Sequence, residues 1–467
     1  MEFLNHLREI VGADHVLVDP SDTGPYLIDW RKRYRGAARA VVRPASTQEV
    51  AGVVTACANE GVPMLPQGGN TGLVGGGTPD ASGTEVVISL QRMNRVRSID
   101  RDNDTITVEA GCILQSVQQA ARENGRLYPL SLAAQGTATI GGNLATNAGG
   151  TQVLRYGNTR DLTLGLEVVL ATGEIWNGLR ALRKDNTGYD LKHLFIGSEG
   201  TLGIITAATL KLFPLPRAQV TAFASMPSLR SAARLLDRAR AGVGASLTAF
   251  EVMSAGCIRR TVQELPRIRA PLPLTSAWYA LLEISDHEDE AHASRALETL
   301  LGGAIEAGDI EDSVVAASLD QSRSLWQVRE GIPEAHAKAG GNVKHDISLP
   351  VSVIPEFVES TNAALAARFP WIEPAVFGHL GDGNLHYNMG TRDGTPIAVA
   401  FTNEQEINDI VHTAVAARGG SISAEHGIGQ LKRGTLADYK SPLELKLMRL
   451  VKQALDPRGL MNPGKVL

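Results

Sequence analysis

The octapeptide HLGDGNLH at residues 379–386 is the feature that most constrains the fold of this chain. Its Asp382-Gly383 pair is a strong signal for a two-residue turn between antiparallel strands, because the centre of such a turn needs positive φ angles. A turn there places His379 directly opposite His386, with Cβ atoms about 4.5–5.5 Å apart on one face of the sheet. Two imidazoles at that separation can bind one divalent metal ion.

Two histidines on a strand surface can also occur without any ligand. Two further observations favour a metal site. Glu425, in the segment AEHG, offers a carboxylate as a third ligand. Strand alternation also puts Asn388 on the same face as the histidines. We therefore predict that His379, His386 and Glu425 bind a divalent metal.

Length and charge narrow the class of protein. A chain of 467 residues is too long for one ordinary hydrophobic core, so we expect at least two domains. The formal net charge of −5 provides no basic field for nucleic acid. No run of apolar residues is long enough to predict a membrane span. The first residues also lack the basic and apolar regions of a signal peptide.

The cysteines indicate the redox environment. Cys57, Cys112 and Cys257 are far apart and form no Cys-x-x-Cys pair. This spacing excludes an iron–sulfur cluster held by this chain alone, and it excludes a disulfide framework. We therefore predict a cytoplasmic protein.

Two glycine-rich loops lie in the N-terminal third of the chain. Residues 67–78, QGGNTGLVGGGT, expose successive backbone N–H groups and allow a pyrophosphate to approach closely. They are neither a dinucleotide fingerprint opening a helix nor a Walker loop. Residues 135–150, QGTATIGGNLATNAGG, add hydroxyl and amide donors. Either segment alone could be a mobile loop, but two of them fit a flavin with its diphosphate better than a lone nucleotide.

The residues around these loops predict the elements that support them. A short β-branched strand at 40–44 precedes a helix that Ser46 or Thr47 can cap, and a second strand at 61–66 leads into the first loop. Residues 166–176 are typical of a hairpin. The pattern is therefore mixed α and β.

The chain resembles the FAD-linked oxidases of the vanillyl-alcohol oxidase type in six ordered motifs: PQGGNTGLVGG, GTATIGGNLATNAGG, GSEGTLGIIT, FGHLGDGNLH, SAEHGIG and DPRGLMNPGKVL. Within that family, their order and spacing are most similar to those of the D-2-hydroxyglutarate, D-lactate and glycolate dehydrogenases. The resemblance covers about residues 40–467. It implies an FAD-dependent D-2-hydroxyacid dehydrogenase.

The resemblance also implies an α+β fold with a two-part FAD-binding domain and a cap domain built on an antiparallel sheet with helices. Residues 213–216, FPLP, are the best linker in the chain. Beyond them, alternating strand and helix patterns over 222–301 are typical of a ferredoxin-like sheet with helices on one side. We predict an FAD-binding domain at 1–216, a substrate-binding cap domain at 217–440 and a C-terminal segment at 441–467 that returns to the FAD domain.

The resemblance further implies which residues hold FAD. The first loop would wrap the diphosphate, the second would hold the isoalloxazine and ribityl chain, and residues 203–205 would meet a ring edge. No His or Cys lies between Pro66 and Thr78 to tether the cofactor, so we predict non-covalent, dissociable FAD. The predicted FAD contacts are Pro66, Gly68, Gly69, Asn70, Thr71, Gly72, Leu73, Gly136, Thr137, Gly141, Gly142, Asn143, Thr146, Asn147, Gly149, Gly150, Gly203, Ile205 and Asn462.

For the reaction, the resemblance assigns zinc, or a manganese-like ion, to His379, His386 and Glu425. Two imidazoles and one carboxylate leave a position open for the hydroxyl of a 2-hydroxy acid. His426 would contact the substrate as general base, and the hydride would pass to flavin N5. Neighbours on a strand point to opposite faces, so Glu425 and His426 can both serve the site only if the strand ends there.

The remote carboxylate of the substrate needs a cationic anchor. The segments WQVRE and KHD match family segments that supply an arginine and a lysine, which predicts Arg329 and Lys344 as anchors. An exposed helix charge or an Arg329–Glu330 ion pair is the alternative. Asn388 is predicted to hydrogen-bond the substrate. Pro333 stands where the D-2-hydroxyglutarate enzymes have threonine, which leaves D-lactate, D-2-hydroxyglutarate and larger D-2-hydroxy acids open.

The partners follow from the same resemblance. Electrons would pass to a separate acceptor such as an electron-transfer flavoprotein or a quinone, and a homodimer is the default expectation. A non-catalytic FAD-binding subunit of a larger complex would not need the full set of His and Glu residues. A metal-dependent hydrolase would leave both glycine-rich loops without a purpose.

Overall fold

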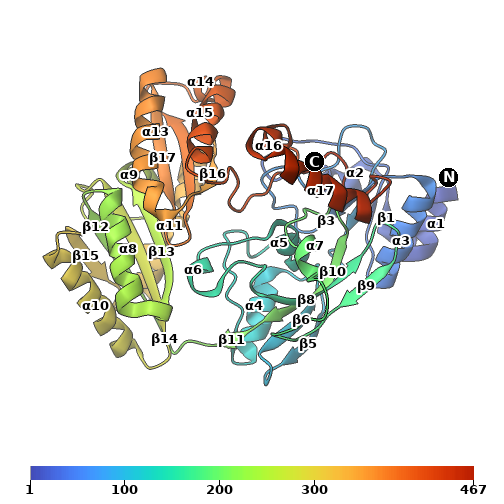
Figure 1. The fold of residues 1–467 in the computed structure, drawn as a ribbon, viewed down its shortest axis with the longest axis horizontal. Coiled ribbons are helices and arrows are strands. Elements are labelled where there is room, and N and C mark those ends of the chain that lie inside the picture. Colours follow the sequence, from blue (N-terminus) through green and yellow to red (C-terminus); the bar gives the residue numbers. More distant parts are fainter. Residues whose placement is uncertain (1) are drawn as a thin grey trace. The chain divides into compact units, whose positions relative to one another are not determined.

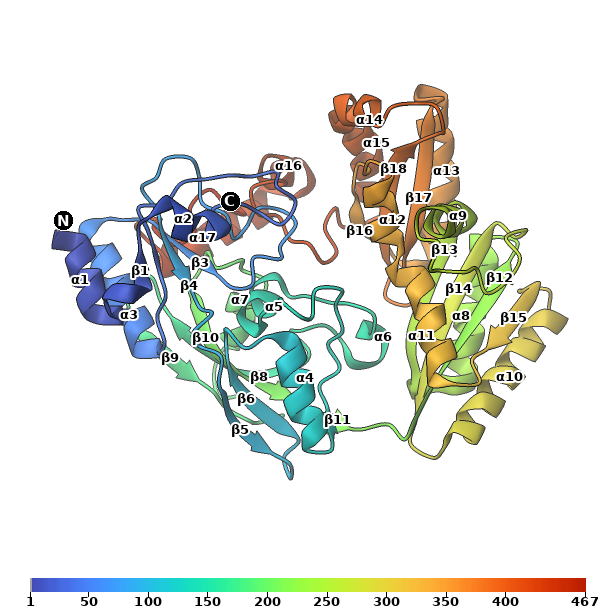
Figure 2. The ribbon, with the colours of Figure 1, turned by 180° about the vertical axis from the view of Figure 1, so that it is seen from behind.

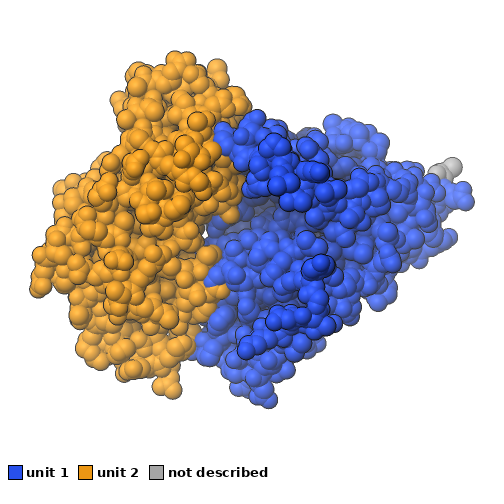
Figure 3. Space-filling view, in the orientation of Figure 1, with its two compact units in different colours: residues 1–150, 157–215, 425–467 blue, residues 151–156, 216–424 orange. Residues whose placement is uncertain are grey.

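The chain folds into two compact units, which Figure 3 colours separately. The structure, a computed structural model, describes residues 2–467. The first division falls within the predicted linker. The second falls at Glu425 and not at 441, because residues 428–432 already hydrogen-bond to unit 1. Residues 151–156 belong to unit 2 and not, as predicted, to the FAD domain. Unit 1 comprises Met1–Gly150, Gly157–Leu215 and Glu425–Leu467, and unit 2 comprises Thr151–Tyr156 and Pro216–Ala424.

The first part of unit 1 is a four-stranded sheet in the order β1-β2-β4-β3, in which β2, β4 and β3 are parallel. The predicted strand–helix–strand pattern is confirmed. The hydroxyl of Ser46 accepts the N–H of Glu49 at 3.1 Å and so caps α3, which ends at Gly61 with φ 67°. The elements are α1 (Glu2–Val11), β1 (Val16–Leu17), α2 (Pro20–Thr23), β2 (Ala40–Val42), α3 (Thr47–Glu60), β3 (Met64–Gln67) and β4 (Val86–Ser89).

The second part of unit 1 is a five-stranded antiparallel sheet in the order β5-β6-β10-β8-β9 (Figure 1). The predicted hairpin over 166–176 is confirmed by the pairing of β8 with β9. A short pair, β7 with β11, lies near the division. The elements are β5 (Val96–Asp100), β6 (Thr105–Glu109), α4 (Leu114–Glu123), β7 (Arg126–Leu127), α5 (Ile140–Thr146), β8 (Thr163–Val169), β9 (Ile175–Gly178), α7 (Lys192–Phe195), β10 (Ile204–Lys211) and β11 (Phe213–Pro214).

The C-terminal segment completes the parallel sheet of unit 1. Its helices are α16 (Arg433–Tyr439) and α17 (Pro442–Leu455), and Ser441 caps α17 in a capping box with Glu444. Beyond α17, the N–H of Met64 donates to the carbonyl of Leu460 at 2.8 Å, and the N–H of Asn462 donates to the carbonyl of Met64 at 2.7 Å. Residues 460–462 therefore run beside β3, directly before the first glycine-rich loop.

Unit 2 is built on a seven-stranded antiparallel sheet in the order β15-β12-β14-β13-β17-β18-β16. Its first half follows the path β12-α8-β13-α9-β14-α10-β15, and the order of these four strands in the sheet is that of the ferredoxin-like fold. The strands are β12 (Ala218–Met226), β13 (Leu247–Ser254), β14 (Trp278–Asp286), β15 (Asp312–Val315), β16 (Asp346–Ser348), β17 (Ile372–His379) and β18 (Asn384–Thr391).

Helices cover both faces of this sheet, so the expectation of helices on one side was wrong. Figure 1 shows α8 and α10 on one face, and Figure 2 shows α9, α11 and α12 on the other. The sequence pattern was followed only over residues 222–301 and assigned no helix to α9, and α11 and α12 lie beyond that range. These helices pack on the sheet through one core that contains Ile258, Leu325, Phe377 and Met253. The helices are α6 (Val153–Tyr156), α8 (Leu229–Val243), α9 (Ala255–Glu264), α10 (Glu290–Glu306), α11 (Leu319–Glu330), α12 (Ile332–Lys338), α13 (Ile354–Arg368), α14 (Ala398–Thr402) and α15 (Glu404–Ala416).

Across residues 2–467, none of these helices is both long enough and apolar enough to cross a membrane.

Candidate functional site

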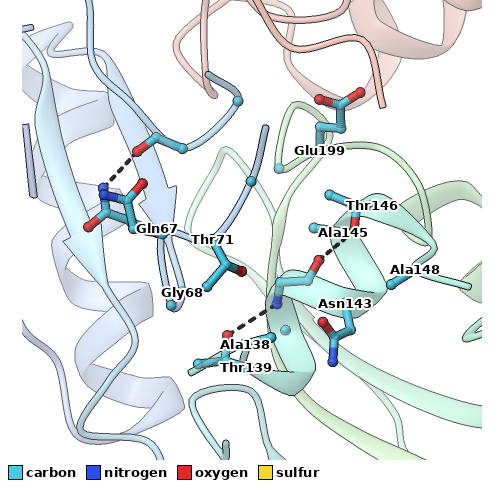
Figure 4. Close-up of a pocket in the computed structure, with 18 of the residues that line it drawn as sticks. Gln67, Gly68, Thr71, Ala138, Thr139, Asn143, Ala145, Thr146, Ala148 and Glu199 are labelled. Carbon is cyan, nitrogen blue, oxygen red and sulfur yellow. Dashed lines mark hydrogen bonds between the residues drawn. The ribbon is translucent and has the colours of Figure 1, made fainter. Parts of the chain in front are cut away.

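Both glycine-rich loops line one cavity in unit 1 (Figure 4). The first loop is closed by the side chain of Gln67, which donates to the carbonyl of Gly77 at 2.7 Å. In the second loop, Thr139 caps α5 by accepting the N–H of Gly142 at 3.4 Å. Helix α5 therefore begins at the wall of the cavity, with its N-terminal backbone close to any ligand there.

The two loops touch each other through glycine. A Cβ atom on Gly68 would overlap the hydroxyl of Thr139, and one on Gly69 would overlap the carbonyl oxygen of Thr137. Both contacts are too close for any side chain. The composition of the first loop is therefore explained in part by the approach of the second loop, in addition to any approach of a cofactor.

The lining fits the FAD that the sequence implies. Among residues 2–467, no backbone N–H from Gly69 to Val74 donates a hydrogen bond to the protein. Buried polar atoms in the wall also lack a partner within the described chain, namely Nδ2 of Asn143 and the hydroxyl of Thr78. Successive unsatisfied N–H groups suit a diphosphate, and buried amide or hydroxyl groups need a polar partner.

Most of the predicted FAD contacts line this cavity, but five do not. Asn147 ends α5 with φ 50° and accepts the N–H of Arg160 at 2.9 Å. Asn462 is buried and donates to the carbonyls of Gly76 and Glu199 at 3.1 and 2.7 Å. Its side chain therefore connects two segments that line the cavity. The predicted residues that line the cavity are Pro66, Gly68, Gly69, Asn70, Thr71, Gly72, Leu73, Gly141, Gly142, Asn143, Thr146, Gly149, Gly203 and Ile205, and those that do not are Gly136, Thr137, Asn147, Gly150 and Asn462.

Glu425 and His426 also line this cavity, in an irregular segment and not in a strand. The carboxylate of Glu425 accepts the N–H of Gly150 at 2.6 Å. Gly427 follows with φ 81°, so the backbone changes direction directly after these two residues. The condition set by strand alternation is therefore met, because no strand continues through these residues.

Glu199 fixes the segment that follows His426, and the sequence did not reveal this role. Its carboxylate accepts the N–H groups of Ile428 and Gly429 at 2.7 and 2.8 Å. Burial raises the pKa of Glu199, although these two hydrogen bonds lower it in part. A buried carboxyl group thus connects one wall of the cavity to the backbone beside His426.

In unit 2, the predicted pairing of His379 with His386 was wrong by two residues. His379 lies opposite Asn384, and His386 lies opposite Phe377. A shift of two residues keeps every side chain on its face of the sheet. The two histidines are therefore diagonal neighbours on one face, with ring centroids 5.7 Å apart and the rings nearly perpendicular.

The register differs because four residues, 380–383, connect the strands in place of two. A tight two-residue hairpin turn needs positive φ at its first central position, Asp382 here, but of the Asp-Gly pair only Gly383 has it, at 85°. The N–H of Gly383 donates to the carbonyl of His379 at 3.1 Å, and the carboxylate of Asp382 accepts the N–H of Asn384 at 3.0 Å. The Asp-Gly signal was right about a reversal and wrong about its length.

The face that carries both histidines also contains a buried ion cluster. The Glu251 carboxylate lies 2.5 Å from Nδ1 of His379 and 2.7 Å from Nε of Arg329. Burial would raise the pKa of Glu251, but the charges of His379 and Arg329 outweigh burial and hold it well below its usual range. Arg329 is therefore neither an exposed helix charge nor paired with Glu330. Its guanidinium also lies 4.8 Å from the centre of the Phe377 ring.

The other predicted substrate residues share this face. Strand β16 pairs with β18 so that Asp346 opposes His386, and the same register places Lys344 opposite Asn388. The side-chain oxygen of Asn388 accepts the N–H of His345 at 3.1 Å. The NH₂ group of Asn388 is therefore the part of its side chain that can donate to a ligand. Asp346 lies 3.9 Å from His386. Lys344 is exposed, whereas Asn388 is buried.

Two acidic residues on this face escaped the sequence analysis. A signal for Glu251 existed, since it is a charged residue inside the otherwise apolar strand segment AFEVM and had to be paired if buried. Asp346 is part of the segment KHD, in which the family resemblance implies a role for the lysine alone. Neither signal identifies the partner, because the partners come from other strands and from α11.

Comparisons with known proteins agree with this architecture. Residues 38–178 match the model of the FAD binding domain, and residues 215–466 match that of the FAD linked oxidases, C-terminal domain. The chain belongs to the family of FAD-linked oxidases. It is 39% identical to a probable D-2-hydroxyglutarate dehydrogenase of Oryza sativa subsp. indica, covering 99% of this chain and 81% of that protein. It is 38% identical to a D-2-hydroxyglutarate dehydrogenase of Xanthomonas citri pv. viticola, covering 98% and 96%.

A solved structure of p-cresol methylhydroxylase with substrate bound has the same fold. Its TM-score is 0.77 at 16% identity, and the match covers 100% of this chain and 96% of that one. At this identity the likeness concerns the fold alone. The predicted α+β fold of the vanillyl-alcohol oxidase type is therefore confirmed.

Proposed function

We propose that this FAD-linked oxidase is a dehydrogenase that oxidises a D-2-hydroxy acid to the 2-oxo acid. The relatives named above are D-2-hydroxyglutarate dehydrogenases, and they span nearly the whole of this chain. The observation that carries the proposal is the lining of the cavity in unit 1. The glycine-rich loops and the candidate base His426 line the same cavity, which supports a proton acceptor close to the proposed cofactor.

Each of the named residues has its own role in the proposed oxidation. Bound FAD supplies the hydride acceptor at its N5 atom. His426 takes the hydroxyl proton, a task that imidazoles commonly perform in general acid–base catalysis. Arg329 and Lys344 bind substrate carboxylate, and the NH₂ group of Asn388 orients the substrate.

The same proposal includes a metal ion, zinc or a manganese-like ion, held by His379, His386 and Glu425. When bound, such an ion lowers the pKa of a coordinated hydroxyl. The donor set fits, because two imidazoles already lie together on one face of unit 2. Chain continuity supports the third ligand, because the N–H of Ala424 donates to the carbonyl of Asp346 at 3.2 Å and Glu425 is the next residue.

We propose the substrate only as a class, the D-2-hydroxy acids. Pro333 opens helix α12 and is exposed, and it offers neither a hydroxyl nor an N–H at the position where the D-2-hydroxyglutarate enzymes have threonine. D-2-hydroxyglutarate is the first candidate because of the relatives, and D-lactate is the second. The electron acceptor we propose is a separate protein or a quinone, and a homodimer in the cytoplasm is our working expectation.

An anaerobic screen of D-2-hydroxy acids tests the function directly. The FAD-loaded protein should lose its flavin absorbance with one or more D acids and keep it with the L enantiomers. The variant His426→Ala should retain FAD but lose most of this reduction. Reduction by no D-2-hydroxy acid would refute the proposal, and full reduction in the variant would remove His426 as base.

Two further measurements test the cofactors. Chelation should suppress turnover and added zinc or manganese should restore it, whereas indifference to chelators would contradict the metal. We also propose a dissociable flavin, because neither His nor Cys lies between Pro66 and Thr78. After acid unfolding and filtration, the yellow colour should appear in the filtrate, and retention by the polypeptide would contradict non-covalent binding.

A further inference from the structure

Glu251 is the most completely buried charged residue on the face that carries the two histidines. It is 0% exposed, in the middle of strand β13. Its strand register places it directly opposite His379 of β17, and α11 covers it with Arg329. A carboxylate in this position loses all contact with water, so its two protein partners must satisfy it.

The contact with His379 selects which ring nitrogen faces outward. The carboxylate lies 2.5 Å from Nδ1, so that nitrogen carries a proton and donates a hydrogen bond to Glu251. When a metal ion is bound, the imidazole is neutral and keeps its one proton on Nδ1, so Nε2 is the nitrogen that acts as the metal ligand. A carboxylate behind a metal-binding histidine fixes the tautomer and the ring orientation in this way.

The contact with Arg329 orders the other side of the site. Glu251 accepts from Nε, at 2.7 Å, and the Phe377 ring lies against the guanidinium. Within the described chain, the two Nη groups of Arg329 make no hydrogen bond to the protein. One edge of the guanidinium is thus held by Glu251, and the terminal donors are left for a carboxylate ligand.

We propose that Glu251 is a positioning residue that serves two functions at once, because one carboxylate orients both the metal-binding imidazole of His379 and the substrate-binding guanidinium of Arg329. This inference rests on the proposed function and deepens it. Loss of Glu251 should therefore weaken both metal binding and carboxylate binding, although Glu251 would touch neither ligand.

The chain offers a matched control in Glu283. It is also a buried glutamate on the same face of the sheet, one strand away on β14. Its partners are Nε1 of Trp326 at 2.8 Å and the hydroxyl of Thr221 at 3.3 Å. The two glutamates differ in their partners, because among the described residues Glu283 contacts neither histidine nor arginine. The variant Glu283→Gln therefore repeats the chemical change without the proposed role.

The first experiment measures zinc affinity without any substrate. The FAD-loaded protein is stripped of metal, and zinc is titrated in competition with a chromophoric chelator. Glu251→Gln should raise the zinc Kd by about 10–100-fold, as expected for loss of such an outer contact, and Glu283→Gln should leave it unchanged. His379→Ala is the positive control. An unchanged Kd in Glu251→Gln, or an equal loss in Glu283→Gln, overturns the proposal.

The second experiment measures carboxylate binding. Glu251→Gln should raise KM for the D-2-hydroxy acid that reduces the flavin best in the screen by about tenfold, because a hydrogen bond to a charged group is lost. Glu283→Gln should leave this KM unchanged. A fall in zinc affinity without any change in KM would overturn the Arg329 half of the proposal.

Folding and the underlying function are checked separately. FAD content and thermal unfolding report whether Glu251→Gln folds. If it does not, nitrogen NMR of ¹⁵N-histidine in the unaltered protein, with His379→Gln for assignment, should show the proton on Nδ1, and a proton on Nε2 overturns the proposal. Failure of unaltered protein to bind zinc or to be reduced refutes the proposed function, whereas normal behaviour together with an unaffected Glu251→Gln refutes only this inference.

Discussion

The carboxylate of Glu199 accepts the backbone N–H of Gly429 at 2.8 Å, although the two residues are far apart in the sequence. The same carboxylate excludes a side chain at Gly427, where a Cβ atom would lie 2.7 Å from its Oε1 and where φ is 81°. Glu199 lines the cavity in unit 1, and the glycines directly follow His426. The path of the backbone beside the proposed base is therefore set by one buried carboxyl group.

The variant Glu199→Ala should slow flavin reduction by the substrate by about a hundredfold, because a displacement of about 1 Å in a reacting group has this effect. Stopped-flow measurement of the flavin absorbance under anaerobic conditions gives the rate. Hydrogen exchange should become faster at the amides of Ile428 and Gly429. Glu199→Gln keeps one acceptor oxygen, so its rate of flavin reduction should lie between those of the unaltered protein and Glu199→Ala. Unchanged exchange at these amides in Glu199→Ala would contradict the role of Glu199.

The sequence predicted what depends on near neighbours. The helix after Ser46, the hairpin over 166–176 and the start of the ferredoxin-like pattern all follow from local periodicity and capping. The shared face of His379 and His386 was also predictable, because strand alternation is unaffected by a two-residue shift.

The remaining features depend on contacts that no local pattern contains. Gly383 lies in the 380–383 connection, where a Cβ atom would overlap the carbonyl oxygen of Leu349 in another segment. The length of this connection therefore depends in part on a contact with a distant part of the chain. Glu251 and Glu199 find their partners across the fold, so the sequence shows only that each acid needs one. The same holds for Asn462, whose side chain donates to two backbone carbonyls of distant residues that no local pattern indicates.

Close contact between the glycine-rich loops makes Gly69 a test of the cavity. Gly69→Ala should lower the FAD content of the purified protein severely, because the new Cβ atom overlaps the carbonyl of Thr137 and must push the loops apart. The ratio of flavin absorbance to protein absorbance measures this. Gly434→Ala is the control, since a Cβ atom there meets nothing within 4 Å. Full FAD content in Gly69→Ala would show that the loops adapt.

Lys344 distinguishes the two candidate substrates. It is exposed on the same sheet face as Asn388, so its charge suits the more remote of two carboxylates. Lys344→Gln should raise KM for D-2-hydroxyglutarate with little change in kcat, because binding that is uniform along the reaction is lost. KM for D-lactate should stay the same. Steady-state kinetics with an artificial electron acceptor gives both values, and equal effects on the two acids would place Lys344 at the nearer carboxylate.

His336 should make the protein sensitive to mild acid. It lies in α12, and among the described residues its Nε2 atom is buried without a hydrogen-bond partner. Burial, together with the nearby charges of Arg260 and Lys344, lowers the pKa of His336 to about 4. Between this value and the ordinary pKa near 6.5, the unfolded chain binds a proton that the folded chain does not. The stability of the fold is therefore complete above pH 6.5 and falls as the pH drops toward 4.

The free energy of unfolding should fall by at most about 1.4 kcal/mol for each pH unit within this window. His336→Gln removes the titrating group, so its melting temperature should fall less between pH 7 and pH 5 than that of the unaltered protein. His6→Gln, at an exposed histidine in α1, should behave like the unaltered protein. Parallel acid profiles for His336→Gln and the unaltered protein would mean that His336 accepts its proton within the fold, for example because α12 opens locally at mildly acidic pH.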